Sequence, residues 1–287
     1  AQDVPLLVDN AHGAYLRFLP GGSRHPIDLG AAACCDSGHK TLPVLTGGAY
    51  LHLGPKAPVQ EESTVRNALA LFGSTSPSYL ILQSLDACNR LLSTDYPARL
   101  QECCDRLAAL RARLNALAAA QGTALPLALN SPAREPMKLT LDAAALGLTG
   151  QALADHLRQN GMECEYADPR YLVLMFTPEN PAEDMARLEA ALAELCARGI
   201  LSAEHREAFC ALARQAESRL TVRQAVFAPQ ETIPAGSALG RVCALPTVSC
   251  PPAIPIVVSG EVIGPAALEL FAAYGVETVS VVKPEKF

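Results

Sequence analysis

The sequence predicts an α/β fold that is followed by a smaller α+β region toward the C-terminus. Three short apolar runs carry the first part of this prediction, at residues 4–8, 31–35 and 49–53. Each run is bounded by Gly, Pro or Asp, which is typical of buried strands in a mostly parallel sheet. The second part depends on a change of pattern at Leu125, after which short strands alternate with amphipathic helices.

Composition and charge exclude several classes of protein. Of the 287 residues, 50% are hydrophobic and only 18% are charged, as in a globular protein with room for two domains. The net charge is −6 and no basic tract is interleaved with aromatics, so we expect no nucleic-acid partner. No run of 18 apolar residues and no leader pattern is present, so we expect no membrane association and a cytoplasmic location.

The ten cysteines do not form a disulfide or zinc pattern. Two pairs are adjacent in sequence, Cys34-Cys35 and Cys103-Cys104, and no Cys-x-x-Cys motif occurs. We therefore expect buried thiols that pack as small hydrophobic side chains. Because no Cys/His set has finger-like spacing, we expect no metal site.

Helical patterns fill residues 61–120. A short helix is expected at 61–71 and a break at 73–77, where Ser76 is predicted to cap the next helix with Pro77 at its first position. That helix is expected to cover 78–92. A longer helix, capped by Thr94 or Asp95, runs to about residue 120. Its apolar stripe is Leu100, Leu107, Leu110, Leu114 and Leu117.

The region after Leu125 predicts an antiparallel sheet with helices. Strands are expected at 138–141 and 170–176, and helices after the cap Thr149, at 181–197 and at 202–219. A proline-rich segment follows from about Thr221. It leads into a helix at 265–274 and a last strand at 278–282.

Two charged residues stand where predicted strands end. Asp9 follows the first apolar run and Lys40 follows the second, with Ser37 and His39 beside the lysine. Ligands of α/β sheets bind at the carboxyl ends of strands. A carboxylate can keep a pyridine nitrogen protonated and a lysine amine can hold an aldehyde, which is the chemistry of pyridoxal phosphate. On spacing alone, both residues are also compatible with ordinary solvated loops, which is the commoner case.

Longer runs around these residues resemble a known family. The segments VDNAHGAYLRF, DSGHKTLPVLTGGAYLH and GSTSPSYLILQSLD are similar to the Orn/Lys/Arg decarboxylases, which are fold-type-I enzymes dependent on pyridoxal 5'-phosphate. The resemblance continues through ADPRYLVLMFTPENPAEDMARLEAAL and CPPAIPIVVSGEVI and covers nearly the whole chain. It implies an aspartate-aminotransferase-like fold. Ser-x-His-Lys-x-Leu-Pro is its most specific motif.

The resemblance implies roles for residues near the first two strands. Lys40 matches the lysine that holds the cofactor as a Schiff base, and Asp9 matches the aspartate paired with the pyridine nitrogen. Ala11 would pack under the ring face. His12 would lie close to the ring or the substrate, and Lys40, Asp9 and His12 are the candidate catalytic residues.

Other matched residues would contact the cofactor's phosphate. Ser37 and His39 match contacts within the same subunit. Ser74 and Thr75 match a loop that reaches toward the cofactor phosphate of a partner subunit. The resemblance therefore implies a homodimer or a larger homo-oligomer, with a small amino acid as substrate.

Four regions follow from the resemblance. Residues 1–93 would be the C-terminal part of the cofactor-binding large domain and 94–124 a connecting helix. Residues 125–220 would form the small α+β domain and 221–287 the C-terminal segment of the family. In the family a long N-terminal portion with a phosphate-cradling turn precedes the Asp9 strand, so we expect this chain to be a piece of a larger protein.

The implied reaction is decarboxylation of a cationic amino acid, namely arginine, lysine or ornithine, to the amine and carbon dioxide. Two alternatives stay open. Lys40 and Asp9 would serve equally well in an aminotransferase or another lyase, since the cofactor carries the chemistry. Without the phosphate cradle, the chain alone could also be catalytically silent.

Overall fold

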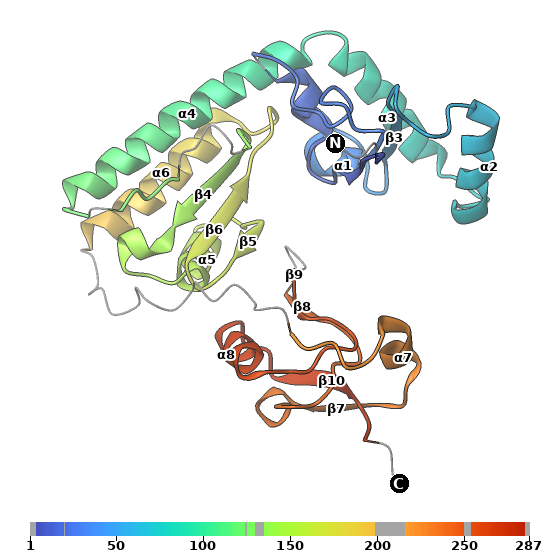
Figure 1. The fold of residues 1–287 in the computed structure, drawn as a ribbon. Helices are drawn as coiled ribbons and strands as arrows, with labels where there is room; N and C mark the ends of the chain where they lie inside the picture. The colour runs from blue at the N-terminus through green and yellow to red at the C-terminus, as the bar shows by residue number, and fades with distance from the viewer. Residues whose placement is uncertain are drawn as a thin grey trace. The chain divides into compact units, whose positions relative to one another are not determined.

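The computed structural model describes residues 4–19, 21–123, 125–129, 135–198, 216–249 and 254–284. Most of the helix expected at 202–219 lies outside these ranges, as do residues 250–253 of the proline-rich run. The chain divides into two compact units (Figure 1). One contains residues 1–109 with 176–182, and the other 110–175 with 183–287.

The first unit is built on a three-stranded sheet with the order β1-β2-β3. Strands β1 (Leu7–Asp9) and β2 (Ala33–Asp36) are parallel, with Asp9 opposite Cys35. Strand β3 (Tyr50–Leu53) pairs with β2 in the antiparallel sense, contrary to the mostly parallel sheet that the sequence predicted. The link from β2 to β3 contains only the four-residue helix α1 (Gly38–Thr41), which is too short for a parallel crossover.

Short and long helices complete this unit. Helix η1 (Ala14–Phe18) follows β1, and α2 (Glu62–Phe72) and α3 (Tyr79–Leu92) follow β3. The cap of α3 is Ser78, whose Oγ accepts the Ile81 N–H, so the prediction of Ser76 as the cap was wrong. Ser76 instead donates its backbone N–H to Ser74 Oγ at 3.1 Å, within the loop that precedes the helix.

Helix α4 (Tyr96–Ala120) belongs partly to each unit. Four leucines of its predicted stripe are fully buried, and only the last, Leu117, is partly exposed. In the first unit the helix is tied to residues 176–182 by an ion pair of 3.0 Å between Arg99 and Glu179. Burial of an apolar stripe, more than helix propensity, stabilises a helix of this length.

In the second unit, an antiparallel sheet with the order β4-β6-β5 confirms the predicted α+β pattern. Its strands are β4 (Lys138–Asp142), β5 (Tyr166–Ala167) and β6 (Tyr171–Met175). The helices are η2 (Ala143–Leu146), α5 (Gly150–Gln159) and α6 (Ala182–Ala197). Figure 1 shows α6 beside α4 along one face of this sheet, where Arg113 of α4 pairs with Glu189 of α6 at 2.9 Å.

The C-terminal residues add two strand pairs to the second unit. Antiparallel partners are β7 (Gln230–Pro234) with β10 (Thr278–Val282), and β8 (Thr247–Ser249) with β9 (Ile254–Val257). The helical elements are α7 (Val222–Phe227), η3 (Ala235–Ser237) and α8 (Pro265–Ala273). Phe271, Val279 and Val281 form the centre of a buried apolar cluster.

Two further observations concern the described part of the chain. None of its helices combines the length and apolar character needed to cross a bilayer. Eight cysteines in it are free thiols, of which Cys34, Cys88, Cys103, Cys196 and Cys243 are buried.

Candidate functional site

The parallel pairing of β1 and β2 brings the predicted site residues to one edge of the sheet. Asp9 is the last residue of β1, and the segment from Ser37 to Lys40 directly follows the last residue of β2. The Asn10 N–H donates to the Cys35 carbonyl at 2.8 Å, which extends the pairing past the end of β1. The carboxyl ends of two adjacent parallel strands are where an α/β sheet binds its ligand.

Lys40 lies in the short helix α1 with its side chain exposed, and Asp9 is exposed as well. His39, the neighbour of Lys40, anchors this turn to the Gly48 carbonyl. The backbone N–H of His39 and its ring Nδ1 both lie near the Gly48 carbonyl, at 3.3 and 3.1 Å. Because a carbonyl oxygen only accepts, Nδ1 carries a proton and the opposite nitrogen, Nε2, is left for another partner.

Gly38 gives this turn its close packing. A Cβ at position 38 would lie 3.1 Å from the Tyr50 ring, closer than nine in ten real contacts of this kind, so the ring would have to shift by a few tenths of an ångström. Ser37 is the residue before α1, and its hydroxyl makes no cap hydrogen bond. That hydroxyl is therefore not committed to the helix end.

The remaining predicted residues divide into two groups. Ala11 and His12 follow Asp9 at the same edge and are partly exposed. Ser74 and Thr75 are not part of this edge, since they lie in the exposed loop that joins α2 to α3. An exposed amine and an exposed carboxylate, with a hydroxyl and imidazoles at the same sheet edge, could hold the aldehyde and the ring nitrogen of a cofactor such as pyridoxal phosphate.

The structure adds a residue that the sequence reasoning missed. Asp36, at the end of β2, is 2% exposed and accepts four side-chain hydrogen bonds. Oδ1 accepts from Asn10 Nδ2 at 2.8 Å and from the Cys34 thiol at 3.3 Å. Oδ2 accepts from His25 Nε2 at 3.0 Å and from His52 Nε2 at 2.9 Å. The two histidines are distant in sequence and share no motif spacing, so no sequence signal could have found this cluster.

Electrostatics in this cluster follow from burial and hydrogen bonding. Burial alone would raise the pKa of Asp36, but the hydrogen bonds from His52, Asn10, His25 and Cys34 outweigh it and hold the pKa well below its usual range. Burial, together with the hydrogen bond to Asp36, raises the pKa of the Cys34 thiol to about 12. The carboxylate is thus ionised and the thiol protonated at neutral pH.

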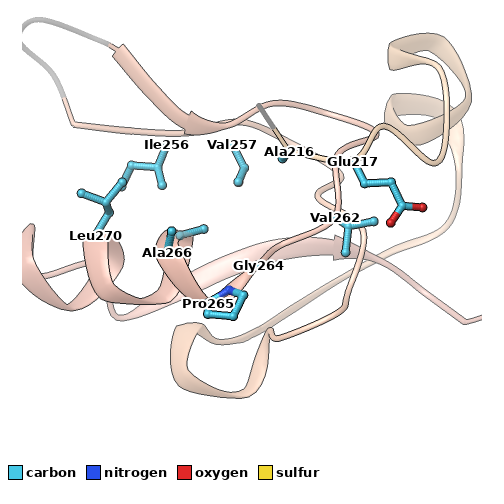
Figure 2. A pocket seen from close by; sticks show the side chains of 10 residues that line it. Ala216, Glu217, Ile256, Val257, Val262, Gly264, Pro265, Ala266 and Leu270 are labelled. Carbon is cyan, nitrogen blue, oxygen red and sulfur yellow. The ribbon is translucent and has the colours of Figure 1, made fainter. Parts of the chain in front are cut away.

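A separate apolar pocket of about 450 Å³ lies in the second unit (Figure 2). Apolar side chains of β9 and α8 line it, among them Ile256, Val257 and Leu270. Of the described residues that line it, Glu217 alone is charged. Binding sites for charged ligands need several convergent polar groups. This pocket is therefore a poorer match to an amino-acid substrate than the edge of the first sheet.

Glu261, an acidic residue of the CPPAIPIVVSGEVI segment, has a structural partner. Its Oε2 accepts the Val258 N–H at 2.9 Å. This bond closes the turn that follows β9, and Glu261 itself forms an isolated β-bridge with Ser218. The carboxylate is thus engaged in local structure.

Comparison with protein families gives a match over the first part of the chain. Residues 1–132 match the model described as Orn/Lys/Arg decarboxylase, major domain. Among curated proteins, an arginine decarboxylase of Bacillus subtilis is 30% identical over 265 residues, covering 91% of this chain and 54% of that protein. An arginine decarboxylase of Bacillus anthracis is 27% identical over 278 residues, covering 93% of this chain and 55% of that protein. The chain spans about half the length of these relatives.

Solved structures with the same fold include two lysine decarboxylases. The constitutive enzyme of E. coli superposes with a TM-score of 0.72 at 18% identity, over 98% of this chain and 55% of that one. Lysine decarboxylase A of Pseudomonas aeruginosa superposes with a TM-score of 0.73 at 17% identity, over 97% and 53%. At such identities the likeness establishes the fold, which is that of the fold-type-I enzymes predicted from the sequence.

Proposed function

Because residues 1–132 match the Orn/Lys/Arg decarboxylase family, we propose that the chain forms the catalytic edge of an enzyme that removes carbon dioxide from a cationic amino acid with the help of pyridoxal 5'-phosphate. The observation that carries the proposal is the parallel register of β1 and β2. It sets Asp9 and the Ser37–Lys40 turn at neighbouring strand ends.

The residues of this edge have complementary roles toward the cofactor. Pyridoxal phosphate supplies the electron sink that accepts the electron pair left when the carboxylate departs. The exposed amine of Lys40 would hold its aldehyde, and the Asp9 carboxylate would hold a proton on its ring nitrogen. Ser37 and the Nε2 atom of His39 would bind the phosphate, and the small side chain of Ala11 leaves room for a flat ring.

We assign arginine as the first substrate to test. Four curated relatives at 27–30% identity are named arginine decarboxylases, and a fifth, at 28%, has no named activity. The lysine decarboxylases resemble this chain only in fold. All candidates carry a distal cation, and the net charge of −6 favours the approach of a cationic substrate.

The proposal includes a second copy of the protein. Large apolar side chains are exposed on α2 and α3, where Leu71 is 80%, Phe72 91% and Leu80 68% exposed. The loop with Ser74 and Thr75 lies between these two helices. Apolar patches of this kind are typically covered by a partner, and the loop would then approach the neighbouring copy's phosphate.

The test measures amine and carbon dioxide released from arginine, lysine and ornithine. It is done on this chain and on the longest natural polypeptide that contains it. Lys40→Ala is compared with Lys56→Ala, which removes an exposed lysine from the turn after β3. We expect release from one of the three amino acids, unchanged in Lys56→Ala and abolished in Lys40→Ala.

Each other outcome has a definite meaning. Keto-acid formation in place of carbon dioxide would establish an aminotransferase. Activity in the long polypeptide alone would establish that the chain by itself is silent. Full activity in Lys40→Ala would refute the assignment of the lysine.

A further inference from the structure

The Asp36 carboxylate joins four separate segments of the first unit. Its hydrogen-bond donors are Asn10 just after β1, Cys34 in β2, His52 in β3 and His25 in the link between β1 and β2. A carboxylate offers about four lone-pair positions, so this group is saturated. Because Asp36 is only 2% exposed, water cannot replace a lost donor easily.

The hydrogen-bond directions show what kind of cluster this is. His25, Cys34 and Asp36 offer ligand atoms within 4.8 Å of one another, a set that could hold a metal ion. However, His25 Nδ1 accepts the backbone N–H of Ile27 at 3.3 Å, so the proton of the neutral ring lies on Nε2. A protonated Nε2 donates to Asp36 and has no lone pair for a metal. The geometry therefore favours a hydrogen-bonded network.

The network holds the two strand ends of the proposed cofactor site. Asn10 lies between Asp9 and Ala11, and Asp36 directly precedes Ser37 and lies four residues before Lys40. The bond of 2.8 Å from Asn10 to Asp36 is thus a side-chain tie between the segment that carries Asp9 and the turn that carries Lys40.

We propose that Asp36 is a positioning residue, which sets the geometry of Asp9 against Lys40 through Asn10 while His25 and His52 hold its carboxylate in place. This inference rests on the proposed function, because it concerns the same site. It predicts that changes at Asn10 or Asp36 alter how the cofactor is held, beyond any effect on folding.

Two variants test the tie. Asn10→Ala removes the link between the strand ends and leaves three donors on the carboxylate. Asp36→Asn keeps the shape, but its amide group faces either Asn10 or a histidine, so a donor meets a donor in both orientations. Asn89→Ala is the matched control, since this exposed residue of α3 borders the same cavity as Asp36, of about 300 Å³.

The experiment titrates pyridoxal phosphate into each protein, in the longest natural polypeptide that contains the chain. It records the affinity from the visible absorbance band and the orientation of the bound cofactor from circular dichroism in that band. The melting temperature is measured on the same samples. We expect Asn10→Ala to bind about tenfold more weakly with a changed dichroism, and Asn89→Ala to behave as wild type.

The outcomes separate this inference from the proposed function. Wild-type affinity and dichroism in Asn10→Ala, even with a lower melting temperature, would overturn the positioning role. If Asp36→Asn does not fold, Asn10→Ala alone decides. One tightly bound transition metal per chain would also overturn it. A visible band that persists in Lys40→Ala would instead refute the proposed function.

Discussion

Replacement of Gly13 by alanine should break the Asn10–Asp36 tie without touching either residue. A Cβ at position 13 would overlap the side chain of Asn10, because its three nearest neighbours are Asn10 Oδ1, Cγ and Nδ2, all within 2.5 Å. The Gly13 backbone, with φ −106° and ψ 11°, is accessible to alanine, so the cost comes from the collision rather than from backbone strain. Asn10 must then leave Asp36.

The expected loss can be worked from these contacts. A hydrogen bond to a charged, buried group contributes roughly 1.5–3 kcal/mol. Replacing glycine lowers the entropy of the unfolded chain and returns about 0.4–1 kcal/mol. Gly13→Ala should therefore lower the free energy of unfolding by about 0.5–2.6 kcal/mol.

A double-mutant cycle in urea provides the assay. In the Asn10→Ala background the colliding atoms are gone, so Gly13→Ala should be neutral or should stabilise by about 0.4–1 kcal/mol. An equal loss of unfolding free energy in both backgrounds would show that the collision with Asn10 is not the cause, because the cost would then come from the backbone or from another contact.

Three further outcomes are expected. Arg170→Ala should lower the free energy of unfolding in urea by about 2 kcal/mol, because the buried Asp142 carboxylate, 2.8 Å from Arg170, loses its cationic partner. Arg187→Ala, which removes an exposed ion pair, should lower it by less than about 0.5 kcal/mol. Because the pKa of Asp36 is lowered in the folded protein, the stability that its carboxylate adds is fully present above the ordinary pKa of 3.8 and is lost as the pH falls below that value. The difference in free energy of unfolding between wild type and Asp36→Asn should therefore shrink in acid, and a difference that stays constant would contradict this. Cys34, with its pKa raised to about 12, should resist iodoacetamide until the protein is unfolded, which mass spectrometry would show.

The sequence predicted elements best where a strong local pattern exists. The antiparallel region after Leu125, the buried leucines of α4 and the strand at 278–282 all follow from apolar periodicity. The direction of β3 was missed, because apolar content says nothing about strand direction and the shortness of α1 was not visible. Elements α7 and β7 were missed because prolines dominate the pattern of their segment.

The residues of the candidate site were likewise predictable only where a local sequence pattern marks them. The position of Asp9 and Lys40 at the sheet edge could be predicted because Asp9 directly follows one apolar run and Lys40 comes soon after the next. Their proposed roles came from the family resemblance. Asp36 could not be predicted, because its role arises from His25 and His52, which only the folded chain brings within 3.0 Å of it. A buried network that joins residues 10 to 52 has no periodicity in the sequence.

The proposed function depends most on Lys40 as the residue that holds pyridoxal phosphate. To test this, the cofactor is added, its link to the lysine is reduced with borohydride, the protein is digested and the modified lysine is located by mass spectrometry. We expect the modification on Lys40, in the peptide that also contains Ser37 and His39. Modification at Lys56, Lys138 or Lys283 in its place would contradict it.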